Sequence, residues 1–106
     1  MLETKPLFIP LKTEPFEAFR CGEKTEELRR YGPCWHAHTC YPGRLVVLSK
    51  GYGKQSRLRG RVIAFKHQWG DTFGSRYKAA IKEHFGTLDL EIACIRIEIE
   101  LSACRG

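Results

Sequence analysis

The sequence feature that most constrains the fold is a strict alternation of apolar and charged residues near its end. In the stretch ACIRIEIEL, residues 93–101, isoleucine or leucine occupies positions 95, 97, 99 and 101, and Arg or Glu fills the positions between them. A period of two residues is typical of a β-strand that turns one face to the core and the other to water. The sequence therefore predicts a half-buried strand here, in a fold that contains other strands.

Patterns along the rest of the chain predict four further strands and two helices. Strands are expected at residues 6–12, 25–30, 45–48 and 59–67. Thr13 is expected to cap the first helix and Gly22 to stop it, and Ser75 and Gly86 are expected to do the same for the second. The order β, α, β, β, β, α, β indicates an α+β fold that is mostly β. A small β-barrel of five or more strands with two short helices would bury the strand edges of so short a chain.

Length and cysteine content limit the class of protein. A chain of 106 residues has room for one hydrophobic core, so we expect a single domain over residues 1–106. No apolar run approaches the roughly 18–20 residues that span a bilayer, and the N-terminal MLETKPLFIPLK has an acid where a signal peptide needs a base. Five cysteines without a pairing framework suit the reduced thiols of the cytosol. We therefore expect a cytoplasmic monomer that needs no cofactor and binds no membrane.

Charge is distributed unevenly along the chain. From Leu28 to Gly70 there is no Asp or Glu, although the net charge of the whole chain is only +6. The same segment contains nine basic residues: Arg29, Arg30, Arg44, Lys50, Lys54, Arg57, Arg59, Arg61 and Lys66. If this segment forms one surface, its field attracts polyanions, and RNA or a nucleotide-like anion is the expected partner. The alternative is a segment whose charge serves only solubility.

The stretch SKGYGKQSRLRGR, residues 49–61, concentrates these charges in a glycine-containing loop. Its expected ligand-binding residues are Lys50, Tyr52, Lys54, Arg57, Arg59 and Arg61. The glycines let a ligand approach the backbone closely, and Tyr52 could stack on a base, as in the binding of single-stranded RNA. The stretch lacks the glycine spacing of a Walker A loop. A flexible hairpin that is kept soluble by its charge is the alternative interpretation.

The stretch CWHAHTC, residues 34–40, resembles a metal site in composition but not in spacing. On a strand, Cys34 and Cys40 would lie roughly 20 Å apart at about 3.3 Å per residue, whereas one zinc ion holds all its ligands within about 2–2.3 Å. We therefore expect no metal. The favoured interpretation is a loop whose Trp35, His36 and His38 face a ligand cleft.

The stretch CGEKTEELRRYG, residues 21–32, contains the remaining candidate residues. Leu28 is its only apolar anchor, so simple alternation would point Glu27 and Arg29 away from the core. A bend after Gly22 could instead bring Lys24 onto the side of Glu27 and Arg29. The first possibility gives a solvated strand face, and the second gives a site.

The spacing G-x-K-x-x-E-x-R, met at Gly22, Lys24, Glu27 and Arg29, resembles the signature of the ASCH domain family. The element order agrees, and the resemblance covers about residues 7–101. It implies a PUA-like barrel with a cleft floored by the motif, and a role in RNA binding. In that arrangement the Glu27 carboxylate would hold the two cations and leave spare N–H donors for a phosphate or a carbonyl.

Some members of the family are enzymes, which gives the alternative function. In the bacterial acetylcytidine amidohydrolases that this chain resembles, the lysine is thought to activate a threonine three residues later, and Glu27 stands at that position here. With Lys24 it could activate a water in a small hydrolase, either a modified-nucleoside amidohydrolase or a ribonuclease. The prediction remains a module that binds RNA or a nucleotide through the motif, with Arg29, Trp35 and Arg44, and through the basic loop. A regulatory module for an acidic protein is a third possibility.

Overall fold

The computed structural model describes residues 5–100, which form one five-stranded sheet, two α-helices and a single 3-10 turn. The elements, in chain order, are β1 (Leu7–Leu11), α1 (Thr13–Arg20), β2 (Glu26–Arg30), β3 (Leu45–Lys50), β4 (Arg57–Trp69), η1 (Gly70–Thr72), α2 (Ser75–Phe85) and β5 (Glu91–Ile99). The predicted order of strands and helices is confirmed, and so is the mostly β character of the fold. None of the helices in this part of the chain is long and apolar enough to cross a membrane.

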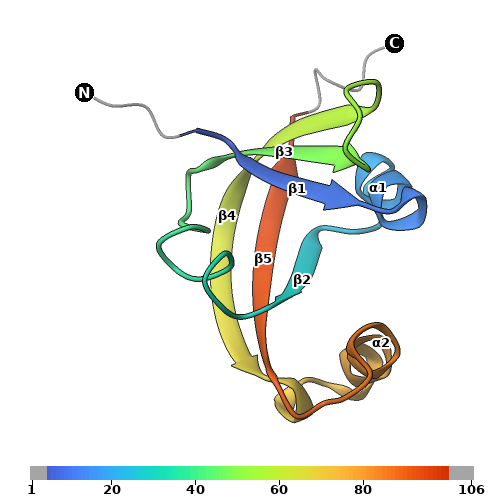
Figure 1. Ribbon diagram of the computed structural model, residues 1–106, viewed down its shortest axis with the longest axis vertical. Helices are drawn as coiled ribbons and strands as arrows, with labels where there is room; N and C mark the ends of the chain where they lie inside the picture. The colour runs from blue at the N-terminus through green and yellow to red at the C-terminus, as the bar shows by residue number, and fades with distance from the viewer. Residues whose placement is uncertain (1–4, 101–106) are drawn as a thin grey trace.

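The sheet has the strand order β1-β3-β4-β5-β2 and curls into a half-barrel (Figure 1). β1 pairs with β3 in parallel, and the other three pairs are antiparallel. β4 and β5 run along most of the length of the molecule, α1 lies beside the ends of β1 and β3, and α2 lies at the opposite end (Figure 1). β1 and β2 are the two edges of the sheet, so backbone hydrogen bonds do not close the barrel between them.

Two hydrophobic clusters lie on opposite faces of the sheet. The larger fills the half-barrel and includes Ile95 and Ile97 of β5, and the smaller lies under α2 and includes Ile92 and Ile81. In β5 the predicted alternation is confirmed for the described residues, because residues 95 and 97 are buried and residues 96 and 98 are exposed. Position 101 lies outside the described residues.

Close packing and a bulge allow β4 to serve both clusters. Gly60 lies directly against the Glu98 carbonyl of β5, where a Cβ atom would collide with the backbone. A register shift follows between Val62 and Ala64, and it leaves Ile63 exposed on the outside. Bulges bend a strand and increase its twist, so the upper half of β4 covers the half-barrel while its lower half reaches α2.

The predicted helix starts are wrong by one residue. Lys12 and Gly74 are the N-caps, both with extended backbone and without a side-chain capping bond, so Thr13 and Ser75 are already the first helical residues. β1 remains paired as far as its last residue, and only Lys12 separates it from α1. The sequence pattern could not show how short this connection is. The end of α2 is as predicted, because Gly86 adopts the left-handed conformation with φ of 81°.

Candidate functional site

Lys24, Glu27 and Arg29 converge, as the bend at Gly22 predicted. The Lys24 Nζ atom lies 3.6 Å from Glu27 Oε1, and Arg29 Nε donates a hydrogen bond of 2.7 Å to Glu27 Oε2. Each carboxylate oxygen therefore faces a different cation. Glu27 is 7% exposed, and it is one of two buried polar residues in the part of the chain that the structure describes. The motif residues of β2 and the turn before it therefore form an ion-pair cluster around a buried carboxylate, and not a solvated strand face.

The turn after α1 brings Lys24 to this cluster. Gly22 has a φ of 87°, which side chains with a Cβ rarely adopt, and the backbone N–H of Lys24 donates to the Ala18 carbonyl at 3.0 Å. The chain therefore folds back against α1 before β2 begins. Lys24 stands outside the strand, where strand alternation does not fix its direction.

The expectation that alternation turns Glu27 away from the core is wrong, because both faces of β2 are covered. Glu27 lies opposite the fully buried Ile95 on the half-barrel side. Leu28 packs against the cluster under α2, and Glu26 accepts a hydrogen bond of 2.7 Å from the Tyr77 hydroxyl on that side. Leu28 therefore packs on one covered face of β2, and the buried Glu27 carboxylate lies on the opposite, half-barrel face.

Arg29 bridges the two free edges of the sheet. Its Nη2 donates to the Pro10 carbonyl of β1 at 2.7 Å, while its Nε is bonded to Glu27 of its own strand. The Trp35 ring lies against the same guanidinium, with its centroid 4.8 Å from Cζ. Hydrogen bonds in two directions and a stacked ring fix the plane of the guanidinium.

A groove of about 580 Å³ opens at this edge of the half-barrel. It is lined by Pro10, Leu11, Lys12, Thr13, Arg29, Lys50, Gly51 and Tyr52. We call it the Arg29 groove. Arg29 of the motif and Lys50 and Tyr52 of the basic loop therefore line the same groove, although the sequence analysis identified the motif and the loop separately.

Lys50 is positioned in the Arg29 groove by α1. Its Nζ lies 3.0 Å from Glu17 Oε2 and 5.5 Å from the centroid of the Phe16 ring. The Lys50 ammonium, together with the Arg20 guanidinium, holds the pKa of the Glu17 carboxyl below its ordinary value. Lys50 thus keeps a partner in the absence of ligand while its side chain remains 35% exposed.

Lys24 does not line the Arg29 groove. It lies at a second groove of about 380 Å³, on the side of the molecule formed by the end of α1 and the upper part of β5. There its Nζ is 5.6 Å from the centroid of the Phe19 ring. The buried Glu27 thus stands between two cations that face different grooves, whereas the sequence predicted one shared cleft.

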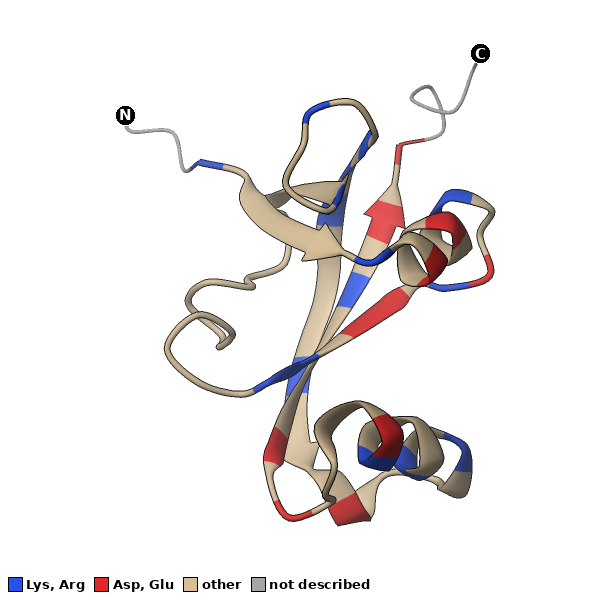
Figure 2. Cartoon of the chain, turned by 45° about the vertical axis from the view of Figure 1, so that its right-hand side comes forward, with Lys and Arg blue, Asp and Glu red and all other residues tan. Residues whose placement is uncertain are grey.

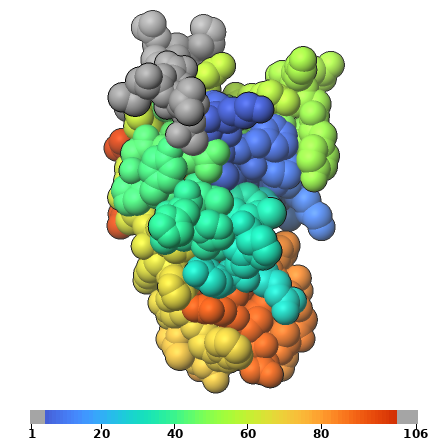
Figure 3. Space-filling model, turned by 60° about the vertical axis from the view of Figure 1, so that its left-hand side comes forward, coloured from blue at the N-terminus to red at the C-terminus, as the bar shows by residue number. Residues whose placement is uncertain are grey.

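The basic loop between β3 and β4 projects beside β1 at the upper end of the molecule (Figure 3). Lys54 is exposed at its tip and Tyr52 is 80% exposed. Arg57 lies with Cζ 5.3 Å from the centroid of the Phe8 ring, and its Nε donates to the Gly53 carbonyl at 3.2 Å. The loop is therefore tied to its own stem and to β1.

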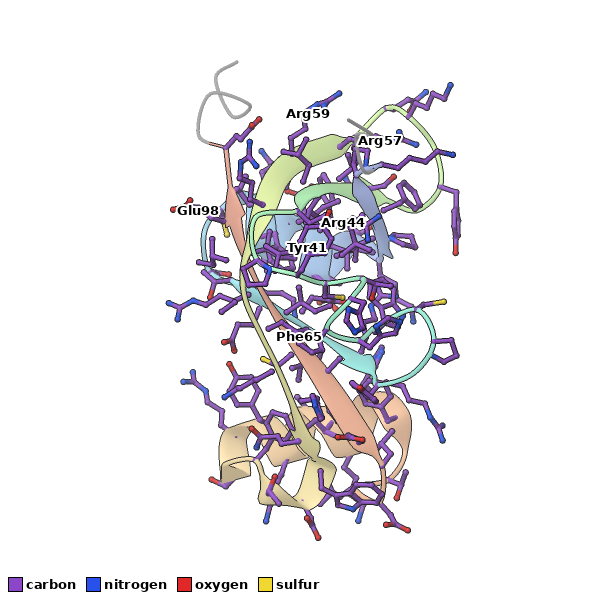
Figure 4. The ribbon with its side chains drawn as sticks, turned by 90° about the vertical axis from the view of Figure 1, so that its left-hand side faces the viewer. Tyr41, Arg44, Arg57, Arg59, Phe65 and Glu98 are labelled. Atoms are coloured by element: carbon purple, nitrogen blue, oxygen red, sulfur yellow. The ribbon has the colours of Figure 1, made fainter. Side chains whose placement is uncertain are left out.

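The other predicted arginines differ in how far their guanidinium groups are hydrogen-bonded within the chain. Arg57 and Arg59 lie near the top of the sheet, whereas Glu98 lies on another side of the strands (Figure 4). Arg61 is exposed but donates to the Gly43 carbonyl at 2.9 Å. Arg44 is fully engaged: Nε and Nη2 donate to the Lys5 carbonyl at 3.1 and 2.8 Å, and Nη1 donates to the Thr39 carbonyl at 2.6 Å. Each nitrogen of the Arg44 guanidinium thus donates to a carbonyl of the chain itself, and the predicted contact of Arg44 with RNA stays a prediction.

The segment with alternating Cys and His forms a series of turns and not a strand. Cys40 is buried and Cys34 is exposed, and the His36 Nδ1 accepts a bond from the backbone N–H of His38. Within residues 5–100, no three His, Cys, Asp or Glu side chains gather as metal ligands. Of the three residues expected to face the cleft, Trp35 lies against Arg29 of the Arg29 groove, and none of the three lines the groove itself.

Three groups near the candidate site were missed by the sequence analysis. The Pro10 carbonyl and the Glu17 carboxylate hold Arg29 and Lys50, and neither has a recognisable sequence signal. Phe8 could have been found, since Leu7, Ile9 and Leu11 of β1 are buried and alternation turns Phe8 outward.

The curled sheet with its two helices defines a PUA-like fold, and solved structures identify its particular form. Two crystal structures of mutant ZmASCH proteins from Zymomonas mobilis have this fold, one with a tyrosine changed to phenylalanine and the other with a serine changed to alanine. Their TM-scores are 0.63 and 0.64, at 20% and 19% sequence identity. Each match covers 86% of this chain. It covers 67% of the first ZmASCH chain and 66% of the second, so this chain spans about two-thirds of their length. The chain therefore has the ASCH fold, as the motif and element order predicted.

The other two comparisons give no match. No protein-family model matches the sequence, and no curated protein matches it. The similarity at this level of identity concerns the fold, so the function has to be argued from the residues of this chain.

Proposed function

We propose that this protein binds RNA or a nucleotide-like anion in the Arg29 groove, with the basic loop as the second half of its binding surface. The observation that supports this most strongly is that Arg29 of the motif and Lys50 and Tyr52 of the acid-free segment line one groove. Two cations and an exposed aromatic ring are the side chains that bind phosphates and bases.

The fixed geometry of Arg29 suits a phosphate. Glu27, Pro10 and Trp35 hold the guanidinium from three sides, while the described residues provide no acceptor for Nη1. A guanidinium that is already oriented loses little conformational entropy when it binds an anion through its remaining N–H groups. In this proposal Glu27 orients Arg29 and does not itself contact the ligand.

The alternative of a small hydrolase, with Lys24 and Glu27 as reacting groups, has less support. Both oxygens of Glu27 face cations and the carboxylate is buried. Lys24 lines the second groove and not the groove that Arg29, Lys50 and Tyr52 line. A substrate in the Arg29 groove would therefore meet the oriented cation and not the proposed reacting pair.

The test is RNA affinity measured by fluorescence anisotropy over a range of salt concentrations. We expect the affinity of the unaltered protein to fall steeply with salt, and Lys50→Gln to weaken binding and to lower the slope of log K against log salt by about 0.7–0.9. Lys82→Gln removes the same charge from the exposed last turn of α2 and is the matched control. No measurable RNA affinity at physiological salt, or equal effects of the two substitutions, would refute the proposal.

A further inference from the structure

α2 covers only the lower part of the outer face of β5. On that face Ile92 and Cys94 are buried, and Ile92 belongs to the hydrophobic cluster under α2. Further along the strand, Arg96 and Glu98 point to the same side and are exposed. Figure 2 shows one basic and one acidic position close together in the upper part of β5. The described residues of a single chain therefore leave the upper part of this sheet face open.

The charges that lie opposite Arg96 and Glu98 on the neighbouring strands are engaged elsewhere. Glu26 of β2 is paired with Arg96 in the sheet, but its carboxylate accepts a hydrogen bond of 2.7 Å from the Tyr77 hydroxyl. Arg61 of β4 is paired with Glu98, but its Nη1 donates to a loop carbonyl at 2.9 Å. Opposite charges that face each other across a sheet usually stabilise it as a pair. In the described part of the chain, however, neither Arg96 nor Glu98 takes part in an ion pair.

An exposed isoleucine lies beside these two charges. The register shift in β4 leaves Ile63 on the outside of the sheet, where it is 46% exposed. One exposed apolar side chain is ordinary on a protein surface. Ile63, Arg96 and Glu98, however, all line the groove of about 380 Å³ whose other wall is the end of α1 and the turn that contains Lys24. We call Ile63, Arg96 and Glu98 the β5 patch.

The β5 patch is complementary to itself. Its two charges have opposite signs and follow each other along one face of one strand. When two copies lie face to face, a two-fold axis that runs across β5 reverses the direction of the strand in the second copy. Arg96 of each copy then lies opposite Glu98 of the other, as in any interface where the same surface is used twice. The same axis places β4 over β4, so the two Ile63 side chains meet.

We propose that the β5 patch binds a second copy of this chain in a symmetric dimer, with Arg96 paired to Glu98 in both directions. A foreign partner would have to supply both charges in the right order, whereas a second copy supplies them from the same two residues. The patch is small, so the dimer is weak and belongs with transient contacts. This departs from the monomer expected from the sequence. The two grooves share no lining residue, so the proposal does not depend on RNA binding in the Arg29 groove.

The experiment is sedimentation velocity at low salt, over protein concentrations from micromolar to millimolar. We expect the average mass to rise with concentration from 12.2 kDa towards twice that value, and to rise less at high salt, which screens exposed charges. Arg96→Glu and Glu98→Arg each place like charges opposite one another and are expected to weaken dimerisation by at least tenfold. The variant with both changes restores opposite charges in exchanged order, so its dimerisation constant should lie within about threefold of the original. Lys5→Glu reverses a basic charge at an exposed position before β1 and is the matched control.

Each outcome of this experiment supports or overturns the dimer. A chain that stays monomeric at every concentration overturns it, whether the face is bare or binds a different protein. A dimer that neither reversal weakens, or that Lys5→Glu weakens as much, uses another face. If the variant with both changes dimerises no better than the single reversals, the two charges do not pair with each other. Circular dichroism confirms the fold of each variant, and Glu98→Arg keeps the test decisive if Arg96→Glu does not fold.

Discussion

Two regions of this molecule are rich in charge, and they use it in opposite ways. On β2 the charges have fixed partners: Glu27 is buried, and Lys24 and Arg29 are paired with it. In the loop between β3 and β4 and at the start of β4, Lys54, Arg57 and Arg59 are exposed, and Arg57 donates to the Gly53 carbonyl of the loop. Figure 2 shows the same contrast: both signs are mixed on α1, β2 and β5, whereas the charged residues of the loop are all basic.

The comparison teaches that residue type alone does not separate an architectural charge from a binding charge. A buried ion pair is costly to break, because the remaining partner is left without its counter-charge. An exposed cation contributes little to folding and is free to meet a phosphate. The motif is therefore expected to respond mainly in stability and the loop mainly in binding.

The largest effect is expected for Glu27→Gln, which keeps the shape of the side chain and removes its charge. Lys24 and Arg29 then lose their common counter-charge in a largely buried position, so the free energy of unfolding should fall by about 1–3 kcal/mol. Chemical denaturation measures the change. RNA affinity should fall as well, because the guanidinium of Arg29 is no longer held.

Glu26→Gln is the matched control, because it makes the same change at the neighbouring position. Glu26 faces α2, and a glutamine there still offers an oxygen to the Tyr77 hydroxyl. We expect a change of less than about 1 kcal/mol and an unaltered RNA affinity. If the two variants lose equal stability and affinity, the Glu27 carboxylate does not hold Lys24 and Arg29 in place, and the proposed difference between the motif and the loop is wrong.

The loop should give the reverse result when Lys54, Arg57 and Arg59 are all changed to alanine. Because these side chains are exposed, the free energy of unfolding should change by no more than about 1 kcal/mol. The slope of log K against log salt should fall by about 2, as expected for three lost phosphate contacts with a single strand. An unchanged slope, measured by the same anisotropy titration, would remove the loop from the binding surface.

The smallest effect concerns the other face of β2 and is seen only at high pH. The hydrogen bond to the Glu26 carboxylate, with partial burial, raises the pKa of Tyr77 from 10.0 to about 12. Since the folded protein favours the neutral phenol, this contribution to stability is complete below pH 10 and is lost as the pH rises towards 12. Ultraviolet titration of tyrosinate should show one late-ionising tyrosine that disappears in Tyr77→Phe. A normal titration of Tyr77 would mean that Glu26 does not hold it.

The fold was more predictable from the sequence than the site. The alternation of residues 95–99 predicted the last strand, and local apolar patterns placed the other strands, because strand periodicity is written in consecutive residues. The meeting of Lys24, Glu27 and Arg29 was predicted from the spacing of the motif and the bend at Gly22. The burial of Glu27 was not, since the presence of α2 over the other face of β2 depends on residues about fifty positions away.

Contacts with the backbone were the least predictable part of the site. The Pro10 carbonyl accepts from Arg29, and the Lys5 and Thr39 carbonyls accept from Arg44. Every residue has a carbonyl, so no side-chain pattern marks which one will receive a guanidinium. Arg44 was therefore predicted as a ligand-binding residue, although its guanidinium donates to carbonyls of the chain itself.

The bridge from Arg29 to β1 has a consequence for how this chain can change in evolution. Where strands are joined by backbone hydrogen bonds, the joint is largely indifferent to side-chain identity, and substitutions accumulate without opening it. Between β1 and β2 of the described chain, the Arg29 guanidinium forms a bridge that contacts the Pro10 carbonyl, Glu27 and Trp35 at once. Lysine has neither the planar fork nor the length to make all three contacts. A substitution at position 29 would therefore change two properties together, the bridge between the two edges of the sheet and part of the positive charge of the groove.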